Sequence, residues 1–401
     1  MRLFELVLAT SFVLLFFQSE LQDKVDFLFG YLDELVALLL LVWAFSVAAT
    51  HRLVSLDVVD ARGVTFLVLM CIIGLLGNAA YGIQPKLIAV AIDLLTCTKF
   101  FIAFWSLAVL AGFYDFGGAY QTCVSFSKVF VVVLFALMVV NQLFDIGMSL
   151  GSRFGIKCFL FLSGHTSNFA ASIVCALALL MGDVRRNRWY ILLALLLLCS
   201  TMRFKAIGFA VVVAMELLFF RDKTRLTAGF VIIAVFAASC AAIGQIDAYY
   251  LDENTARSVL SRQSLAVAGW FFPLGSGFAS YGSFVTLAHY VDLYDVLGFG
   301  EVYGLTRVDP SYLADSFWPI VIGQFGLIGS VFFVALVIFF LQGVLKRQRE
   351  GGSYFWASLA IPTYLLIAST SEPAFFNAYA VSLALALALV LFGSARPKTG
   401  R

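Results

Sequence analysis

Groups that could transfer protons gather in one long polar stretch of the chain, residues 245–315. His289 lies within this stretch and Asp315 ends it. A carboxylate or an imidazole can accept the proton of an attacking hydroxyl group, so both residues are candidate bases. Each also has a structural interpretation. Asp315 precedes Trp318-Pro319, where it could cap a helix or favour the helix dipole, and His289 could be an ordinary loop residue.

Basic side chains form a second group of chemical interest, because they lie just outside apolar segments. The candidates are Arg153, Lys157, Arg203 and Arg262. Arginine stays charged and offers a planar fork to phosphate oxygens, so such a set suits a phosphate or pyrophosphate. Arg153 and Lys157 would share one face if Ser152–Leu162 were a short interfacial helix. For any single cation, contact with lipid headgroups is the alternative interpretation.

The elements that must position these groups are apolar segments. The chain of 401 residues is 62% hydrophobic and only 12% charged, with a mean hydropathy of +0.99, which excludes a water-soluble globule. A helix of about 20 apolar residues crosses the hydrocarbon core of a bilayer. About twelve such segments are predicted, near Leu3–Phe17, Leu35–Ala49, Val64–Ala80, Leu87–Phe113, Val129–Phe144, Asn168–Met181, Trp189–Met202, Ala206–Phe220, Thr227–Ile243, Phe317–Leu341, Tyr354–Ala368 and Phe375–Phe392.

These segments predict an all-α polytopic membrane protein in which residues 1–401 form a single integral membrane domain. Basic loops are retained on the cytoplasmic side, and the clusters Arg185-Arg186 and Lys346-Arg347 fall on the same side as the N-terminus. Both termini are therefore expected in the cytoplasm, and residues 245–315 on the opposite side. A net charge of +2 gives no reason to expect a nucleic-acid partner.

The polar stretch also contains a turn-rich segment that could contact a ligand. Residues 271–282 read Phe-Phe-Pro-Leu-Gly-Ser-Gly-Phe-Ala-Ser-Tyr-Gly, in which the glycines permit close backbone approach. Tyr281, with Trp318 beyond the stretch, offers an aromatic surface for a sugar. The seven cysteines lie in or beside apolar segments without a Cys-x-x-Cys pair, so neither a disulfide framework nor a zinc site is expected.

Several motifs, taken in order, resemble the O-antigen polymerase and ligase superfamily of bacterial envelopes. Arg262 stands ten residues before Phe272-Pro273-Leu274-Gly275-Ser276-Gly277. The resemblance covers about residues 164–329. Its other motifs are Ser163-Gly164-His165-Thr-Ser-Asn168-Phe-Ala, Thr201-x-Arg203 and Asp315-Ser-Phe-Trp318 followed by Gly323-Gln324-Phe-Gly326-Leu-Ile-Gly329.

The resemblance implies a glycosyltransferase of GT-C-like architecture that needs no metal or other cofactor. It would work at the periplasmic face of the bacterial inner membrane, on undecaprenyl-pyrophosphate-linked oligosaccharides as donor and acceptor. A chain-length regulator protein is a further partner that the family implies. Arg203 and Arg262 would bind the pyrophosphate, with Arg153 and Lys157 as weaker candidates. The substrate-binding candidates are His165, Asn168, Tyr281 and Trp318.

One departure from the family pattern favours the polymerase over the ligase. Ligases of the family carry a His-Asn pair eleven residues before a Gly-x-x-Gly motif, where this chain has Asp315-Ser316. Asp315 could accept the proton of a sugar hydroxyl while lipid pyrophosphate leaves from the attacked carbon. Two alternatives stay open: a ligase that moves polymer to lipid A-core, and a lipid-linked oligosaccharide flippase or transporter. Transporters commonly have two similar halves, and no such repeat is visible here.

Overall fold

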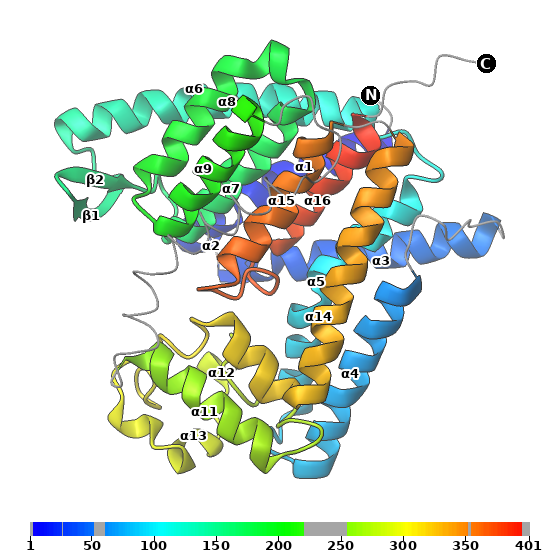
Figure 1. The fold of residues 1–401 in the computed structure, drawn as a ribbon, viewed down its shortest axis with the longest axis vertical. Helices are drawn as coiled ribbons and strands as arrows, with labels where there is room; N and C mark the ends of the chain where they lie inside the picture. Colours follow the sequence, from blue (N-terminus) through cyan, green and yellow to red (C-terminus); the bar gives the residue numbers. More distant parts are fainter. Residues whose placement is uncertain (1–2, 26, 52–60, 220–254, 352–353, 395–401) are drawn as a thin grey trace.

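A computed structural model describes residues 3–25, 27–51, 61–219, 255–351 and 354–394. Apart from one β-hairpin, the regular elements of this described part are helices (Figure 1). Its α-helices are α1 (Leu3–Phe16), α2 (Gln18–Lys24), α3 (Leu32–His51), α4 (Ala61–Tyr81), α5 (Leu87–Leu110), α6 (Gly117–Phe144), α7 (Thr166–Leu180), α8 (Val184–Ser200), α9 (Phe204–Phe219), α11 (Ala256–Trp270), α12 (Val285–Ala288), α13 (Leu293–Val296), α14 (Phe317–Gly351), α15 (Phe355–Ala368) and α16 (Ala380–Ala388). Short turns of 3₁₀ or π type are η1 (Phe27–Tyr31), η3 (Met181–Asp183), η5 (Phe299–Glu301) and η6 (Leu389–Gly393).

Six helical stretches of the described part are long and apolar enough to cross a membrane. The bent pair α1 and α2, which turns by 58°, brings the number to seven if it is one span. The expectation of an all-α membrane protein is thus confirmed, but the count is lower than the twelve predicted. One reason is that α15 and α16 are short apolar helices, and the predicted span Thr227–Ile243 lies outside the described residues.

The stretch Thr166–Ser200 consists of two antiparallel helices, α7 and α8. Asp183 has non-helical backbone angles (φ −136°, ψ 83°) and its carboxylate accepts a hydrogen bond from Arg186 N at 3.1 Å, so it ends one helix and caps the next. The start of α7 lies next to the segment that follows α8, because Arg203 Nε donates to Thr166 Oγ1 at 2.7 Å. The two predicted segments Asn168–Met181 and Trp189–Met202 are therefore a hairpin of helices.

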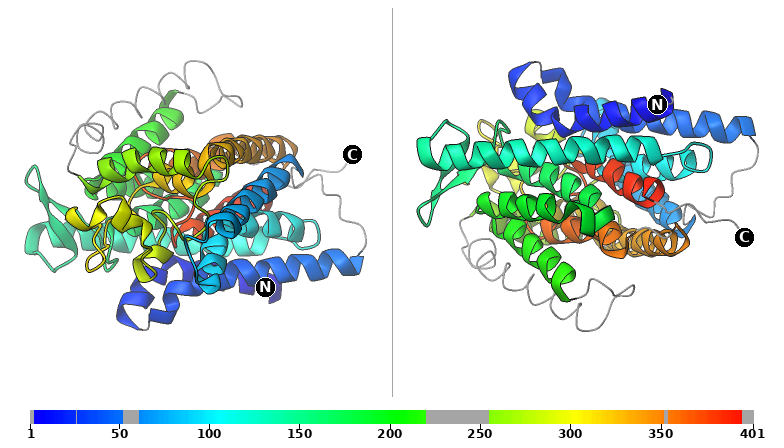
Figure 2. Two further views of the ribbon diagram at one scale, coloured as in Figure 1. Left: turned by 90° about the horizontal axis from the view of Figure 1, so that it is seen from below. Right: turned by 90° about the horizontal axis from the view of Figure 1, so that it is seen from above.

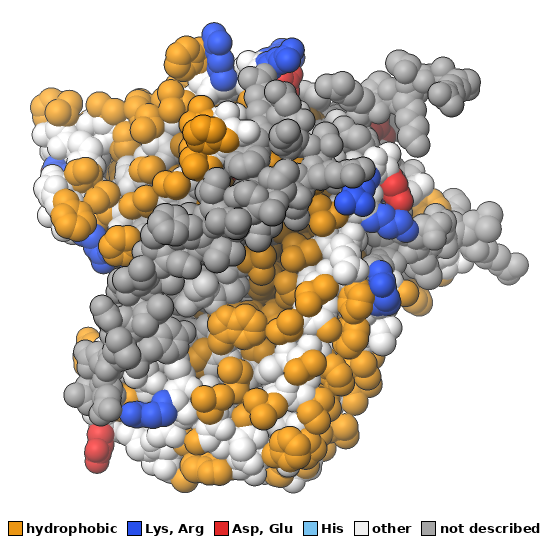
Figure 3. Space-filling view, viewed as in Figure 1, with side chains coloured by type: hydrophobic (Ala, Val, Ile, Leu, Met, Phe, Trp, Pro, Cys, Tyr) orange, Lys and Arg blue, Asp and Glu red, His pale blue; other side chains and the backbone are white. Residues whose placement is uncertain are grey.

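Burial separates inner from outer helices. Nearly every residue of α7 and all residues of α16 are buried, and α16 packs against α5 and α7 in the interior of the bundle (Figure 2). The outer helices α3, α4, α6 and α14 leave large apolar side chains exposed, among them Phe45, Val129 and Val331. Figure 3 accordingly shows a largely apolar outer face. A helix that is apolar all round must be buried, whereas exposed apolar faces in a chain of this composition are suited to lipid.

A glycine-rich loop is wedged between α4 and α14, and we call residues Leu274–Gly282 the glycine wedge. At Gly326 (φ 63°, ψ −171°) the helix α14 is broken, which frees backbone carbonyls one turn earlier. Ser276 N donates to Gly323 O at 3.0 Å and Gly277 N donates to Gln324 O at 2.9 Å. A Cβ atom on Gly275 would lie 2.3 Å from Gly326 N. A side chain at Gly275 would collide with the main chain of α14, so this position requires glycine.

Polar side chains anchor the same wedge from two other helices. Asn78 of α4 accepts from Phe278 N at 2.7 Å and donates to Phe278 O at 2.9 Å. Asp93 of α5 accepts from Ala279 N at 2.6 Å and from Gln324 Nε2 at 2.9 Å. Asp93 itself is fully buried. The polar stretch is thus attached to the membrane helices at a defined place.

Candidate functional site

A cavity of about 550 Å³ lies beside the starts of α3 and α7 and the first half of α5. Loop segments 284–289 and 311–315 form a second side, and the turn between α15 and α16 forms a third. Glu34, Lys99, His165, His289, Asp315 and Glu372 are its ionisable lining side chains. Carboxylate, amino and imidazole groups are therefore brought to one cavity at the edge of an apolar bundle.

Four of the residues predicted from the sequence face this cavity together. His165 and Asn168 come from the start of α7, and His289 and Asp315 come from the polar loop. His165 and His289 are 124 residues apart in the sequence. The hairpin of α7 and α8 on one side and the glycine wedge on the other position these two groups.

Asp315 is held in an ion pair with Arg257 in the first turn of α11. Its Oδ2 accepts from Arg257 Nη2 at 2.5 Å and from Arg257 Nε at 2.9 Å. Both side chains are partly exposed, at 23% for Arg257 and 30% for Asp315. The helix α14 begins two residues later at Phe317, so the observed role of this carboxylate is an ion pair with α11. The sequence gives no sign that Arg257 and Asp315, 58 residues apart, are in contact.

His289 also lines the cavity and contacts the start of α5. Lys86 Nζ, at the start of α5, lies 3.3 Å from His289 Nδ1, and Gln84 Nε2 donates to the backbone oxygen of His289 at 3.3 Å. The lysine can only donate, so this contact makes Nδ1 the acceptor and leaves the proton of a neutral ring on Nε2. His289 is thus an ordered part of the cavity edge.

His165 faces the cavity from the last position before α7. Its backbone is extended (φ −140°, ψ 132°), and its side chain does not cap the helix. Burial lowers the pKa of His165 below the ordinary imidazole value, Glu372 and Asp315 oppose this shift, and Arg203 and Lys205 add to it. One turn further along α7, Asn168 Nδ2 donates to Ser19 Oγ at 2.9 Å.

An ion pair that was not predicted lies beside His165, and we call Lys205, Glu372, Ser167 and Tyr379 the charged wall. Lys205 Nζ forms a short contact with Glu372 Oε2 and donates to Ser167 Oγ at 2.9 Å. Tyr379 OH donates to Glu372 Oε1 at 2.8 Å. Burial raises the pKa of Glu372, but Lys205 and these hydrogen bonds outweigh it and hold the pKa below its ordinary value.

The signal for Glu372 was present in the sequence. It is a lone acid in Ser369-Thr-Ser-Glu372-Pro373, between two predicted apolar segments, and an acid at such a place needs a partner. Lys205 is a cation close to an apolar segment, but nothing in the sequence spacing links it to Glu372. A second buried pair joins Lys99 of α5 to Glu34 of α3 at 2.6 Å, with Asp33 also in contact.

Arg203, in the turn between α8 and α9, contacts the start of α7. Its Nε–Thr166 contact places the guanidinium next to His165, close enough to influence the titration of that ring. Arg153 contacts the same turn from the β-hairpin side, where its Nη1 donates to Met202 O at 3.4 Å. Lys157 Nζ donates to Asn141 O at 3.0 Å and lies 3.6 Å from Asp145. Arg203 is thus the predicted cation nearest to the cavity's histidine.

The condition of an interfacial helix over Ser152–Leu162 is not met, because Ser149–Phe159 forms a β-hairpin. Strands β1 (Ser149–Arg153) and β2 (Ile156–Phe159) pair antiparallel, with Arg153 opposite Ile156. Phe154 and Gly155 both have positive φ, as a two-residue hairpin turn requires. Arg153 and Lys157 therefore do not share a helix face. Repeated glycines in this segment were the signal against a helix.

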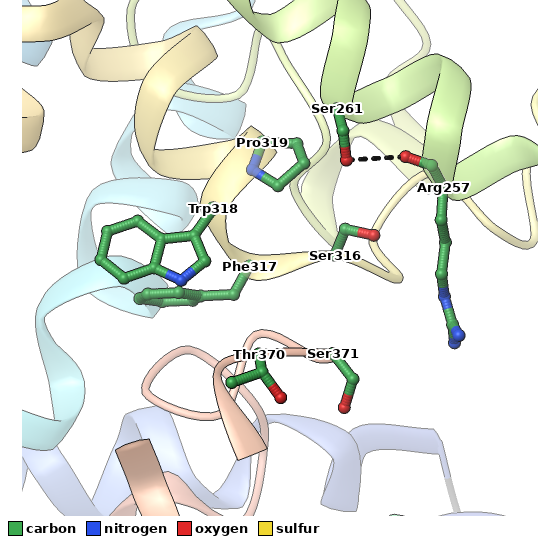
Figure 4. Close-up of a pocket in the computed structure, with 8 residues that line it drawn as sticks. All are labelled: Arg257, Ser261, Ser316, Phe317, Trp318, Pro319, Thr370 and Ser371. Carbon is green, nitrogen blue, oxygen red and sulfur yellow. Dashed lines mark hydrogen bonds between the residues drawn. The ribbon is translucent and has the colours of Figure 1, made fainter. Parts of the chain in front are cut away.

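Three other predicted residues lie away from the cavity lining. Arg262 is on an exposed face of α11. Tyr281 is fully buried, and its hydroxyl donates to Leu260 O at 2.6 Å. Trp318 lines a separate pocket of about 10 Å³ with Arg257, Ser316 and Ser371, a volume that suits a single water molecule (Figure 4). Along the chain, Ser316 and Ser371 are next to the cavity residues Asp315 and Glu372.

Among the described residues, no group of three or more His, Cys, Asp or Glu side chains is placed to hold a metal ion. No protein-family model matches the chain. No curated protein matches it either. The chemical reading of the cavity therefore depends on its own side chains.

Proposed function

We propose that this protein is a membrane glycosyltransferase of the O-antigen polymerase type. It transfers a growing polysaccharide from undecaprenyl pyrophosphate to a sugar hydroxyl of an incoming lipid-linked repeat unit. In this proposal the cavity faces the periplasm of the bacterial inner membrane and both termini are cytoplasmic. About twelve spans in a GT-C-like arrangement, and a chain-length regulator as partner, belong to the same proposal.

The observation that carries the proposal is one polar cavity at the edge of an apolar bundle. His165, Asn168 and Asp315, which the motifs of the resemblance singled out, line it together with His289 of the polar stretch. A substrate with a lipid tail and a polar headgroup can keep the tail beside the apolar helices while the headgroup enters such a volume. Arg203 beside His165 supplies positive charge where a pyrophosphate would leave.

The chemistry is a displacement at the anomeric carbon of the donor. The acceptor oxygen forms the new glycosidic bond as it loses its proton, and the bond to the lipid pyrophosphate breaks with its electron pair. Fixed cations near the leaving oxygen favour this step, because they interact more strongly in a water-poor cavity than in bulk water. In the proposal Arg203 fills this role, whereas Arg262 on the exposed face of α11 is not part of the donor site.

A deletion in the source bacterium, complemented by plasmid-borne protein, tests the proposal. Deletion should replace the ladder of long surface polysaccharides by material carrying a single repeat unit, and the wild-type protein should restore the ladder. Arg203→Ala should fail to restore it at an unchanged membrane level of the protein, whereas Arg188→Ala, at the α8 end that lies away from the cavity, should restore it. An unchanged ladder on deletion overturns the polymerase.

Two other outcomes of the same strain identify the alternatives. Long polymer that accumulates on undecaprenyl pyrophosphate and never reaches lipid A-core indicates a ligase. Single repeat units that accumulate on the cytoplasmic leaflet indicate a flippase. Lipid extraction followed by mass spectrometry separates these products, and protease-free labelling of intact spheroplasts reports the leaflet.

A further inference from the structure

The titratable groups that face the cavity differ in how far their acceptor atoms are already engaged. Asp315 Oδ2 accepts two hydrogen bonds from Arg257. Glu372 is paired with Lys205 and accepts from Tyr379. His289 Nδ1 lies 3.3 Å from Lys86 Nζ. Glu34 is paired with Lys99. Glu34, Glu372 and His289 would each have to share or give up a contact before they could accept a proton from a substrate. Asp315 keeps Oδ1 outside its hydrogen bonds, but its charge is already compensated by the guanidinium of Arg257.

His165 differs from all of these groups. Within the described residues its imidazole forms no hydrogen bond or ion pair, and it is exposed to the cavity. Its main chain is fixed nonetheless, because its carbonyl accepts from Phe169 N at 3.4 Å as the first bond of α7. A ring with a fixed attachment and unoccupied nitrogens in a cavity of about 550 Å³ is arranged for contact with a bound molecule.

We infer that His165 is the group that takes the proton from the acceptor hydroxyl, in place of Asp315 or His289. This inference rests on the proposed glycosyl transfer. An unprotonated ring nitrogen of His165 removes the hydroxyl proton as the oxygen attacks the anomeric carbon, and the pyrophosphate leaves with the bonding electrons. The resulting imidazolium then returns its proton to water in the cavity.

The charges around His165 suit both stages of this transfer. Arg203 and Lys205 of the α9 start favour the neutral ring before the reaction, and together with burial they lower the pKa of His165. Glu372 of the turn after α15 and Asp315 of the loop act in the opposite direction and stabilise the imidazolium once it forms. The base is thus neutral near pH 7 and has carboxylates close by when it becomes charged.

The test uses full-length protein in lipid nanodiscs, with lipid-linked repeat units extracted from the deletion strain as both donor and acceptor. His165→Gln should lower the initial rate of chain extension by about 10²–10⁴-fold, the usual contribution of a general base. Binding of the extracted lipid, measured by its co-purification, should change little. His51→Gln is the matched control, because His51 ends α3 about 25 Å along the helix from Glu34.

Two further readouts separate a base from a structural residue. The wild-type rate should fall as pH decreases through the pKa of His165, and this acid limb should be missing in His165→Gln. His165→Gly leaves space in the cavity, and added imidazole should restore part of its rate, while it should not rescue Arg203→Ala. Glycine is tolerated at the position before a helix, so this variant should fold.

The outcomes distinguish the base from the function. If His165→Gln and His165→Gly extend chains at the wild-type rate while Asp315→Asn does not, the base is Asp315 and the glycosyl transfer stands. If His289→Gln shows the loss instead, the same holds for His289. If wild-type protein forms no polymer from the extracted lipid, the proposed function fails. A loss of rate without imidazole rescue and with reduced lipid binding makes His165 a binding residue and overturns the inference.

Discussion

The glycine wedge and the charged wall both attach a loop to the membrane helices, but they do so by opposite means. The wedge presents bare backbone to α14 and is secured by amide hydrogen bonds to Gly323 and Gln324. The charged wall joins α9, α7 and the turn after α15 through Lys205 and Glu372, two buried charges of opposite sign. The first region needs the absence of side chains, and the second needs particular ones.

This difference assigns different roles to residues that the resemblance grouped together. The Gly-Ser-Gly motif is fully used in contacts within the protein, so its glycines serve packing and the position of the loop. The charged wall lies beside His165, and two of its residues, Ser167 and Glu372, line the cavity where a ligand would bind. Motif residues near the cavity are therefore better candidates for chemistry than motif residues in the wedge.

The largest effect is expected from breaking the charged wall. Lys205→Met leaves Glu372 buried without its cation and should cost about 3–5 kcal/mol of stability. Lys205→Met combined with Glu372→Gln removes both charges and should recover much of this loss. Thermal unfolding of the purified protein in detergent measures both. If the single variant unfolds at the wild-type temperature, the pair does not support this end of the bundle.

The wedge offers a second comparison between two glycines of similar backbone conformation. Gly275 (φ 79°) faces the backbone of Gly326, whereas Gly298 (φ 75°) has no described atom within 4 Å of an added Cβ. Gly298→Ala should cost only the left-handed conformation, about 1–2 kcal/mol. Gly275→Ala should cost about 1–3 kcal/mol more, because main-chain atoms must move. Equal melting temperatures for the two variants would contradict the wedge as a close backbone contact.

These two regions also mark what the sequence can and cannot reveal. Hydropathy predicts the helices because lipid imposes one requirement on all of them, and motif order brought His165 and Asp315 into one hypothesis. The partner of Glu372 could not be deduced, because an apolar helix gives no indication of which helix it contacts. The hairpin at Arg153 was missed because charge spacing was given more weight than the glycines around it.

Variants of Arg203 and Arg262 test whether an arginine contributes to function through its closeness to the cavity or through its place in a motif. Arg203→Ala should lower kcat/KM for chain extension by about 10–100-fold, the value of one charged hydrogen bond, while Arg262→Ala should have little effect. Arg203→Lys should be intermediate because lysine lacks the planar fork. Thr166→Val is the control, since it removes only the contact that Arg203 makes with α7. Equal losses for both arginines would restore Arg262 to the donor site.

The smallest expected effect is a shift in the pH dependence of the chain-extension rate when Asp315 is replaced. Asp315 raises the pKa of His165, so its replacement by asparagine should lower that pKa further. Because the neutral ring is the active form, the acid limb of the rate should move to lower pH, with a rate near pH 7 close to that of the wild type. His289→Gln should leave the limb in place. An Asp315→Asn protein that is inactive at every pH would instead make the carboxylate the proton acceptor, and the ion pair with Arg257 would then be the resting state of a base.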